Sequence, residues 1–378
     1  MRVVVKARGT KRAVGVAGLN RCDWPGRVRV PRGPGNVENL WNSPWLSTAY
    51  GLREAGACDL GNAAVMDIQR KRQLVKSLVD TRGTKNCDHE LLRAMAAEEL
   101  VRVSARFVCH RSTFGELERH EREWLRAWAV GKTVRKAALG GRSAARVHGM
   151  PVIATSPEDI ELVPATGRCP SNSSWPRGCT YFRGAYRADE FTLVDGVRVT
   201  TQIRTGIDVA LRHGFREGLV AMDWLLGRHP RANIEFEIRK LGRRRGIGVA
   251  RAALAHAVSN VRSPYESYAR ALLIEAGIGP IRVNVRVGRY EVDLLIGERV
   301  VVEIDGAVKY DGKTYGRTDE MLRKEREREK HLLNSAYHVR RYNPLELLSH
   351  PDRFVAEVRL AHEISQPPAS PEHHQPQR

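Results

Sequence analysis

Residues 289–310 read RYEVDLLIGERVVVEIDGAVKY, and this stretch decides how the C-terminal part of the chain folds. Residues 290–296 and 299–305 are rich in Val, Leu and Ile, and Gly297-Glu298 joins them, which is the composition of a β-hairpin. Side chains of a strand alternate between its two faces. We therefore expect one face of the hairpin to carry the apolar set Val292, Leu294, Ile296, Val300, Val302 and Ile304.

The opposite face of this hairpin carries four carboxylates. If the turn spans residues 297–299, Asp293 lies opposite Glu303 and Glu291 lies opposite Asp305. Directly opposed side chains are about 4.5–5.5 Å apart at Cβ, where like charges are destabilising. A hard divalent cation with oxygen ligands at about 2.0–2.1 Å removes this repulsion. The alternative is a solvated polar face of an antiparallel sheet.

Length and charge limit the possible functions. The chain has 378 residues, enough for two or three domains, and a net charge of +20, which favours nucleic acid or an anionic surface as partner. No apolar run approaches the roughly 18 residues of a membrane span, and the N-terminus does not resemble a signal peptide. The six cysteines are scattered without CxxC spacing, which argues against a zinc site and favours a reduced, cytoplasmic setting. Pairing of Cys169 with Cys179 across a Pro/Ser/Gly loop is the one disulfide that we consider.

Patterning divides the chain into segments with different expected structures. Residues 1–65 are dominated by Gly, Pro, Arg and Asn without a stable period, so we expect disorder, or a natural start at Met66. We predict a winged-helix-like module over 66–115, a mixed α/β region over 116–258, an α/β domain over 260–360, and a disordered tail over 361–378. The expected fold class is thus a multidomain α+β protein.

The module over 66–115 has a helical period in 66–80, a second helix in 89–100 and a strand or hairpin in 100–112. Two short helices followed by a β-wing commonly present a helix to the DNA major groove. Basic residues of the first helix could then contact phosphate: Arg70, Lys71, Arg72 and Lys76. A helical cap with a solvated basic face is the equal alternative.

In the middle region we expect Trp124 and Trp128 to pack in a core, strands over 158–205 with a hairpin turn at Asp195-Gly196, and helices to about residue 258. The triplet Arg243-Arg244-Arg245 lies between Gly242 and Gly246 and is a candidate phosphate contact. A solvated loop explains the triplet equally well.

The last domain begins with a helix that Ser263 caps, with Pro264 in its first turn and Glu266 completing a capping box. A strand over 281–288 precedes the carboxylate hairpin. A charged helix over 318–335, a strand over 338–343 and a helix from Pro344 follow it.

This order of elements resembles the restriction-endonuclease-like PD-(D/E)XK superfamily, and within it the uncharacterised group related to very-short-patch-repair endonucleases. The segments that carry the resemblance are YEVDLLIG, VVVEIDGAVKY, KEREREKHLL and YHVRRYNP, within residues 260–350. The positions matching that group's pattern are Asp293, Glu303, Asp305, Gly306, Lys309, Tyr310, Glu325, Arg326, Arg328 and Arg340. More loosely, RSAARVHGMP and VTTQIRTGIDVAL, within residues 66–230, resemble actinobacterial proteins that join an AbiEi-type antitoxin-like region to such a domain.

The resemblance implies a DNA endonuclease that uses Mg²⁺ or Mn²⁺. Asp293, Glu303 and Asp305 would be the metal ligands, and Glu266 resembles the helix acid that some members bring to the metal. Asp305 replaces the usual lysine of the E-x-K motif, so Lys309 becomes the candidate catalytic cation. Arg326 and Arg328, like the triplet, become candidate DNA contacts.

Two other functions remain open at this stage. The protein would be a DNA-binding regulator or antitoxin if the winged helix reads its own promoter and the last domain is inactive or binds a toxin partner. RNA binding or processing is also compatible with the charge.

Overall fold

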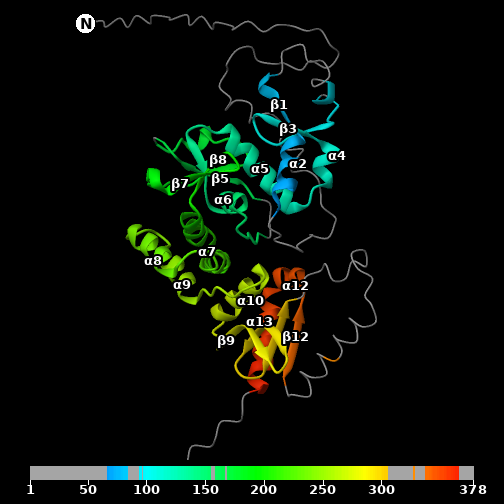
Figure 1. The fold of residues 1–378 in the computed structure, drawn as a ribbon, viewed down its shortest axis with the longest axis vertical. Helices are drawn as coiled ribbons and strands as arrows, with labels where there is room; N and C mark the ends of the chain where they lie inside the picture. The colour runs from blue at the N-terminus through cyan, green and yellow to red at the C-terminus, as the bar shows by residue number, and fades with distance from the viewer. Residues whose placement is uncertain are drawn as a thin grey trace, which may run out of the picture.

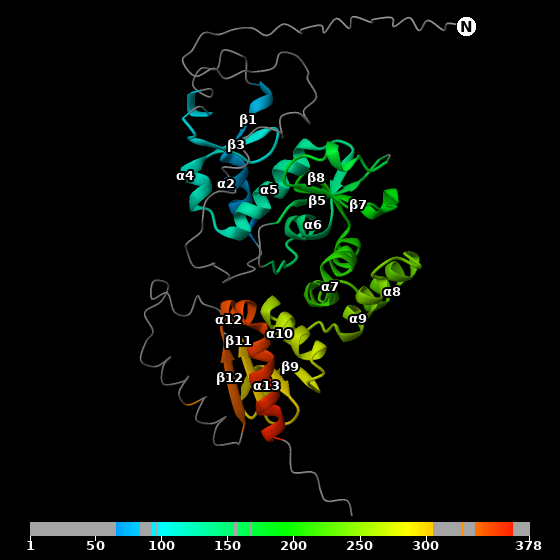
Figure 2. The same ribbon diagram turned by 180° about the vertical axis from the view of Figure 1, so that it is seen from behind.

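The computed structural model describes residues 66–83, 93–95, 97–154, 158–166, 168–304, 327 and 337–365. Within this part, helices accompany three sheets, which confirms the α+β class. Figures 1 and 2 show the two sheets of the N-terminal half at one end, the C-terminal sheet at the other, and α7–α9 between them. The expected N-terminal extension, the charged helix apart from Glu327, and the tail beyond 365 lie outside the described residues. Of the second helix predicted over 89–100, residues 93–95 are helical, whereas 97–99 are not and Leu100 belongs to a strand.

The first sheet has the strand order β1-β3-β2. Its elements and the helices beside it are α2 (Ile68–Lys76), β1 (Leu78–Asp80), β2 (Leu100–Arg102), β3 (Phe107–His110) and α4 (Arg111–Glu116). The predicted hairpin over 100–112 is confirmed as β2 and β3. The helix predicted over 66–80 is too long, because Leu78–Asp80 pair antiparallel with β3 instead of continuing the helix.

The second sheet has the order β6-β5-β4-β8-β7. It is built with α5 (Arg119–Thr133), β4 (Ala137–Leu139), α6 (Gly141–His148), β5 (Ile160–Pro164), β6 (Cys179–Tyr181), β7 (Phe191–Val194) and β8 (Val197–Thr200). The hairpin at Asp195-Gly196 is confirmed, and both turn residues have positive φ, 51° and 72°, as a type I′ turn requires. Trp124 and Trp128 are buried and stacked, as predicted.

One apolar core contains residues from both sides of the boundary predicted at residue 115. One cluster runs from Leu74 of α2 through Trp128 of α5 to Val199 of β8. The first two sheets therefore share a core, because α5 packs its apolar face against elements of both. The N-terminal module is not an independent unit within the described residues.

Three helices follow the second sheet: α7 (Gln202–Leu226), α8 (Arg231–Lys240) and α9 (Ile247–His256). Their own core joins α10 of the last domain through Ala271. A buried ion pair spans this junction, in which Arg270 of α10 donates to Asp223 of α7 at 2.6 and 2.7 Å. Paired charges buried in this way fix the position of α10 relative to α7.

The third sheet has the order β12-β11-β10-β9, with β12 parallel to β11 and the other pairs antiparallel. Its elements are α10 (Pro264–Glu275), β9 (Ile281–Val287), β10 (Tyr290–Ile296), β11 (Val300–Ile304), β12 (His338–Tyr342), α12 (Pro344–Ser349) and α13 (Pro351–Ser365). Leu272 of α10 and Phe354 of α13 pack on one face of the sheet. The predicted final helix is two helices, and α13 passes residue 360 to Ser365.

No helix among the described residues is long and apolar enough to cross a membrane. Cys169 and Cys179 are both free thiols, so the disulfide considered from the sequence is not formed.

Candidate functional site

The predicted carboxylate hairpin is present in the expected register. Leu294 pairs with Val302, Leu295 with Val301 and Ile296 with Val300. The next pair along this register is Asp293 with Glu303. The Ile304 backbone N–H donates to Asp293 Oδ2 at 2.8 Å, which holds the carboxylate against β11. Every residue of β11 is buried, as its Val/Ile composition predicts.

One apolar residue departs from the predicted pattern. Leu294, Ile296 and Val302 pack toward α10 and α13, but Val292 belongs to a second cluster with Leu295 and Val301. The irregularity coincides with Asn284 of β9, which the β9–β10 register places opposite Asp293 and whose φ is +46°. Asparagine tolerates this left-handed conformation better than most side chains. The strict alternation assumed from the sequence is broken at this point.

A row of polar residues crosses the whole sheet at the level of Asp293. Asn284 of β9, Asp293 of β10 and Glu303 of β11 are consecutive in register, and Arg341 of β12 pairs with Glu303. Arg341 Nε is 3.2 Å from Glu303 Oε2, and the Glu303 side chain is only 3% exposed. Arg341 comes from the strand beyond Glu303, so this ion pair lies one strand further from Asp293 in the register.

Glu266 of α10 joins this row from outside the sheet. Its Oε2 accepts from Asn284 Nδ2 at 3.0 Å and from the Arg262 backbone N–H at 3.2 Å. Burial, and next the negative charge of Asp293, raise the pKa of Glu266 to about 7. Glu266 is thus a buried acid beside a second carboxylate, which is the electrostatic pattern of many functional sites.

The sequence suggested a capping box for Glu266, and this is only half correct. Ser263 caps α10, because its Oγ accepts from the Tyr265 N–H at 3.2 Å. The Glu266 carboxylate instead binds the N–H of Arg262, the residue before the cap. The same oxygen, Oε2, also accepts from Asn284 of the sheet, so Glu266 connects the helix to the carboxylate row.

Several predicted site residues cannot be placed. Asp305, Lys309, Arg326 and Arg328 lie outside the described residues. Arg340, matched by the resemblance, is exposed and opposite Val302, whereas its neighbour Arg341 lies in the row. Sequence reasoning missed Arg341 and Asn284, since their positions depend on strand pairing that no local pattern encodes.

The donor set suits a hard divalent cation. In the part of the chain described, no group of three or more His, Cys, Asp or Glu side chains is arranged to enclose a metal by itself. Mg²⁺, however, is usually held by one or two carboxylates together with water and substrate phosphates. The adjacent acids Glu266 and Asp293 supply such a pair.

The basic residues predicted to contact DNA divide into two groups. Arg70 and Lys71 of α2 turn inward and pair with Glu121 and Asp195, at 2.5 and 2.8 Å. This leaves Arg72 and Lys76 exposed on the helix. The Arg243–Arg245 triplet lines a pocket beside α7 and α8, not the carboxylate row.

Neither the known protein-family models nor the curated proteins give a match to this chain.

Proposed function

We propose that this protein is a divalent-metal-dependent endonuclease that hydrolyses phosphodiester bonds in DNA. The observation that carries the proposal is that the buried carboxyl group of Glu266 lies close enough to Asp293 for the two to interact electrostatically. Asp293 is next to Glu303 in the strand register, and the order of elements in this domain resembles the PD-(D/E)XK superfamily. Buried like charges are costly unless a proton or a cation compensates them.

Asp293 and Glu266 would hold Mg²⁺ or Mn²⁺, with Glu303 and Asp305 as the further acids of the site. The metal would polarise the scissile phosphate and activate the attacking water. The Ile304 N–H orients Asp293, and Asn284 orients Glu266, so that both carboxylates are fixed before substrate arrives. Such preorganisation lowers the cost of reaching the reactive geometry.

A cation is needed where the superfamily uses the lysine that Asp305 replaces here. Lys309 is the candidate from the sequence. Arg341 is a second candidate, because its guanidinium lies next to Glu303. A fixed positive charge at this point would stabilise the charge that develops on the phosphate.

A second candidate function is DNA binding without cleavage. It is favoured by the three-stranded sheet β1-β3-β2 with α2 beside it, which agrees with a winged-helix-like module. The exposed Arg72 and Lys76 of α2 would contact phosphates in that case. Operator binding would not require a metal.

Incubation with supercoiled plasmid separates the two functions. The nuclease proposal predicts conversion to nicked or linear DNA with Mg²⁺ or Mn²⁺ and none in EDTA. Substrate binding should weaken by about tenfold or more between roughly 50 and 200 mM salt, because phosphate contacts release counterions. Intact plasmid with both metals, together with a metal-independent shift of the protein's own promoter, would favour the regulator instead.

A further inference from the structure

A second polar site lies within residues 182–245, apart from the carboxylate row. It is a cavity of about 670 Å³ bordered by the loop after β6, by α7 and by the α8–α9 loop. This volume is in the range of small-molecule sites. Its walls are strongly basic, and the cations that line it are Arg183, Arg187, Arg212, Lys240 and the triplet Arg243–Arg245.

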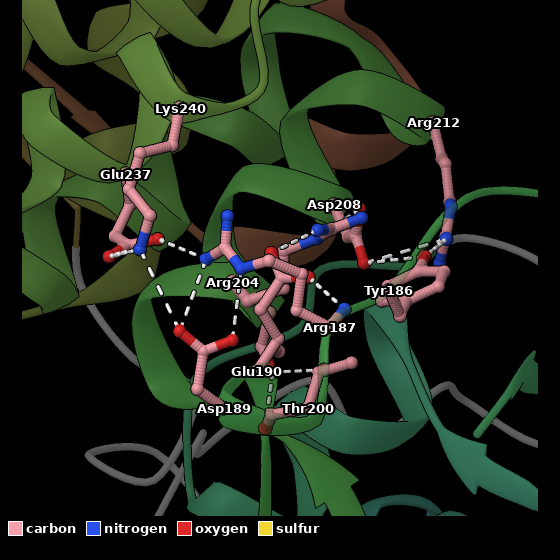
Figure 3. A network of polar contacts seen from close by, with 11 residues as sticks. Tyr186, Arg187, Asp189, Glu190, Thr200, Arg204, Asp208, Arg212, Glu237 and Lys240 are labelled. Carbon is pink, nitrogen blue, oxygen red and sulfur yellow. Dashed lines mark hydrogen bonds and ion pairs between the residues drawn. The ribbon is translucent and has the colours of Figure 1, made fainter. Parts of the chain in front are cut away.

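The two acids that line the cavity share one buried arginine beneath them. Glu190 Oε1 accepts from Arg204 Nη1 at 2.5 Å, and Asp208 Oδ1 is 3.2 Å from Arg204 Nε. Arg204 itself is 2% exposed. Figure 3 shows this buried layer, with Tyr186 donating to Asp208 at 2.9 Å. Arg204 supplies one positive charge to these two acids, and Asp208 Oδ2 also lies 3.5 Å from Nη2 of the wall residue Arg212. The cations that line the cavity still outnumber its two acids, so the walls keep a net positive charge.

Several of the wall cations have no acidic partner among the described residues. None of Arg243, Arg244 and Arg245 forms an ion pair there, and Arg183 donates only to the Asn172 amide, at 3.2 Å. Arg212 Nη1 is buried without a hydrogen-bond partner within the same part of the chain. Arg183 and the triplet line one concave space together, where several guanidinium groups without acidic partners could bind one anion by charge-assisted hydrogen bonds.

The backbone holds the triplet in place. Gly242 and Gly246, on either side of it, have φ of +59° and +82°, a conformation that favours glycine. Arg244 Nη2 lies 2.0 Å from the position that a Cβ on Gly184 would occupy, so any larger residue at 184 would displace the guanidinium. Arg244 is thus packed into the wall of the cavity, and Arg243 and Arg245 are exposed on either side of it.

We propose that this cavity binds a compact oligophosphate, such as the phosphate chain of a nucleoside di- or triphosphate or an inorganic polyphosphate. Arginine recognises phosphate with paired, directional donors. The aromatic rings nearby are covered, since Arg212 lies over Phe182 at 3.8 Å and Arg204 over Tyr186 at 4.0 Å. A guanidinium therefore already occupies one face of each of these two rings, and the rest of the lining is mostly basic, which favours recognition through the phosphates. A concave site also fits a compact ligand better than a duplex.

Isothermal titration of the full chain with ATP and with tripolyphosphate tests the proposal. EDTA in the buffer keeps metal–phosphate binding at the carboxylate row out of the measurement. We expect saturable binding and a loss of about tenfold or more in affinity for Arg244→Ala, the size expected for one charge-assisted contact. Arg251→Ala is the matched control, because Arg251 is exposed on α9 and does not line the cavity.

Equal affinity for the two ligands would identify the phosphate chain as the recognised group, and tighter binding of ATP would identify a nucleotide. Thermal melting of both variants shows whether they remain folded. If Arg244→Ala unfolds, Gly184→Leu serves in its place, since it displaces the same guanidinium. Absence of saturable binding, equal weakening by Arg251→Ala, or binding only of a DNA oligonucleotide would overturn the proposal. Plasmid nicking is unaffected by these outcomes, so this site and the nuclease proposal fail separately.

Discussion

Replacing Asp293 by asparagine is expected to lower the rate of metal-dependent plasmid nicking by about a thousandfold or more, because metal ligation supplies several kcal/mol of transition-state stabilisation. Asparagine is the informative substitution. Its Oδ1 can still accept the Ile304 N–H, which now binds Asp293 Oδ2 at 2.8 Å, while the negative charge is lost. The fold should therefore persist, and the loss can be assigned to the site.

Glu298→Gln is the matched control for Asp293→Asn. Glu298 lies in the turn at the other end of the same hairpin, where its exposed carboxylate is 3.2 Å from Arg282. Removing the same charge there should leave nicking within about twofold of the wild-type rate, because exposed ion pairs contribute little. Wild-type nicking by Asp293→Asn, with an unchanged melting temperature, would remove Asp293 from the proposed site.

Replacing Glu266 by glutamine is expected to stabilise the protein at about pH 8 and to change its stability little near pH 4.5. The pKa of Glu266 is raised from 4.5 to about 7 in the folded protein. Below pH 4.5 the Glu266 carboxyl group is protonated in both the folded and the unfolded chain, so its burial does not lower the free energy of unfolding through ionisation. Between 4.5 and 7 only the unfolded chain ionises, and stability falls with rising pH. Above pH 7 the cost reaches about 3 kcal/mol, which the neutral glutamine avoids.

Denaturant unfolding at about pH 4.5 and pH 8 measures this difference. Glu275→Gln, on the same helix, is the control, because its carboxylate is partly exposed and paired with Arg216. Mn²⁺ at pH 8 should stabilise the wild type more than Glu266→Gln, since a bound cation offsets the buried charge. An equal effect of Glu266→Gln at both pH values would show that Glu266 ionises without a buried cost.

The sequence could predict the hairpin because its information is local. A strong β composition, a Gly-containing turn and alternation are sufficient to place Asp293 opposite Glu303. The same reasoning placed Val292 wrongly, because the positive φ of Asn284 on a neighbouring strand cannot be read from the hairpin. It also selected Arg340 over Arg341, since only the parallel pairing of β12 with β11 brings Arg341 to Glu303.

The basic pocket shows a different limit of sequence reasoning. The Gly-flanked Arg243–Arg245 triplet is visible in the sequence as a candidate phosphate contact, with a solvated loop as the equal alternative. Its partners were not visible, because Gly184 and Arg212 come from a loop and a helix that are distant in sequence. Only such tertiary contacts decide whether the side chains of a basic triplet are fully solvated or line a cavity.

The central claim is that Asp293 and Glu266 belong to one divalent-metal site, and direct metal binding tests it. Free Mn²⁺ can be followed by electron paramagnetic resonance while the full chain is titrated at about pH 8. We expect saturable binding by the wild type and by Glu298→Gln, and affinities weaker by about tenfold or more for Asp293→Asn and for Glu266→Gln. Mn²⁺ that stays free in the presence of the wild type, or binds all four proteins equally, would contradict the account.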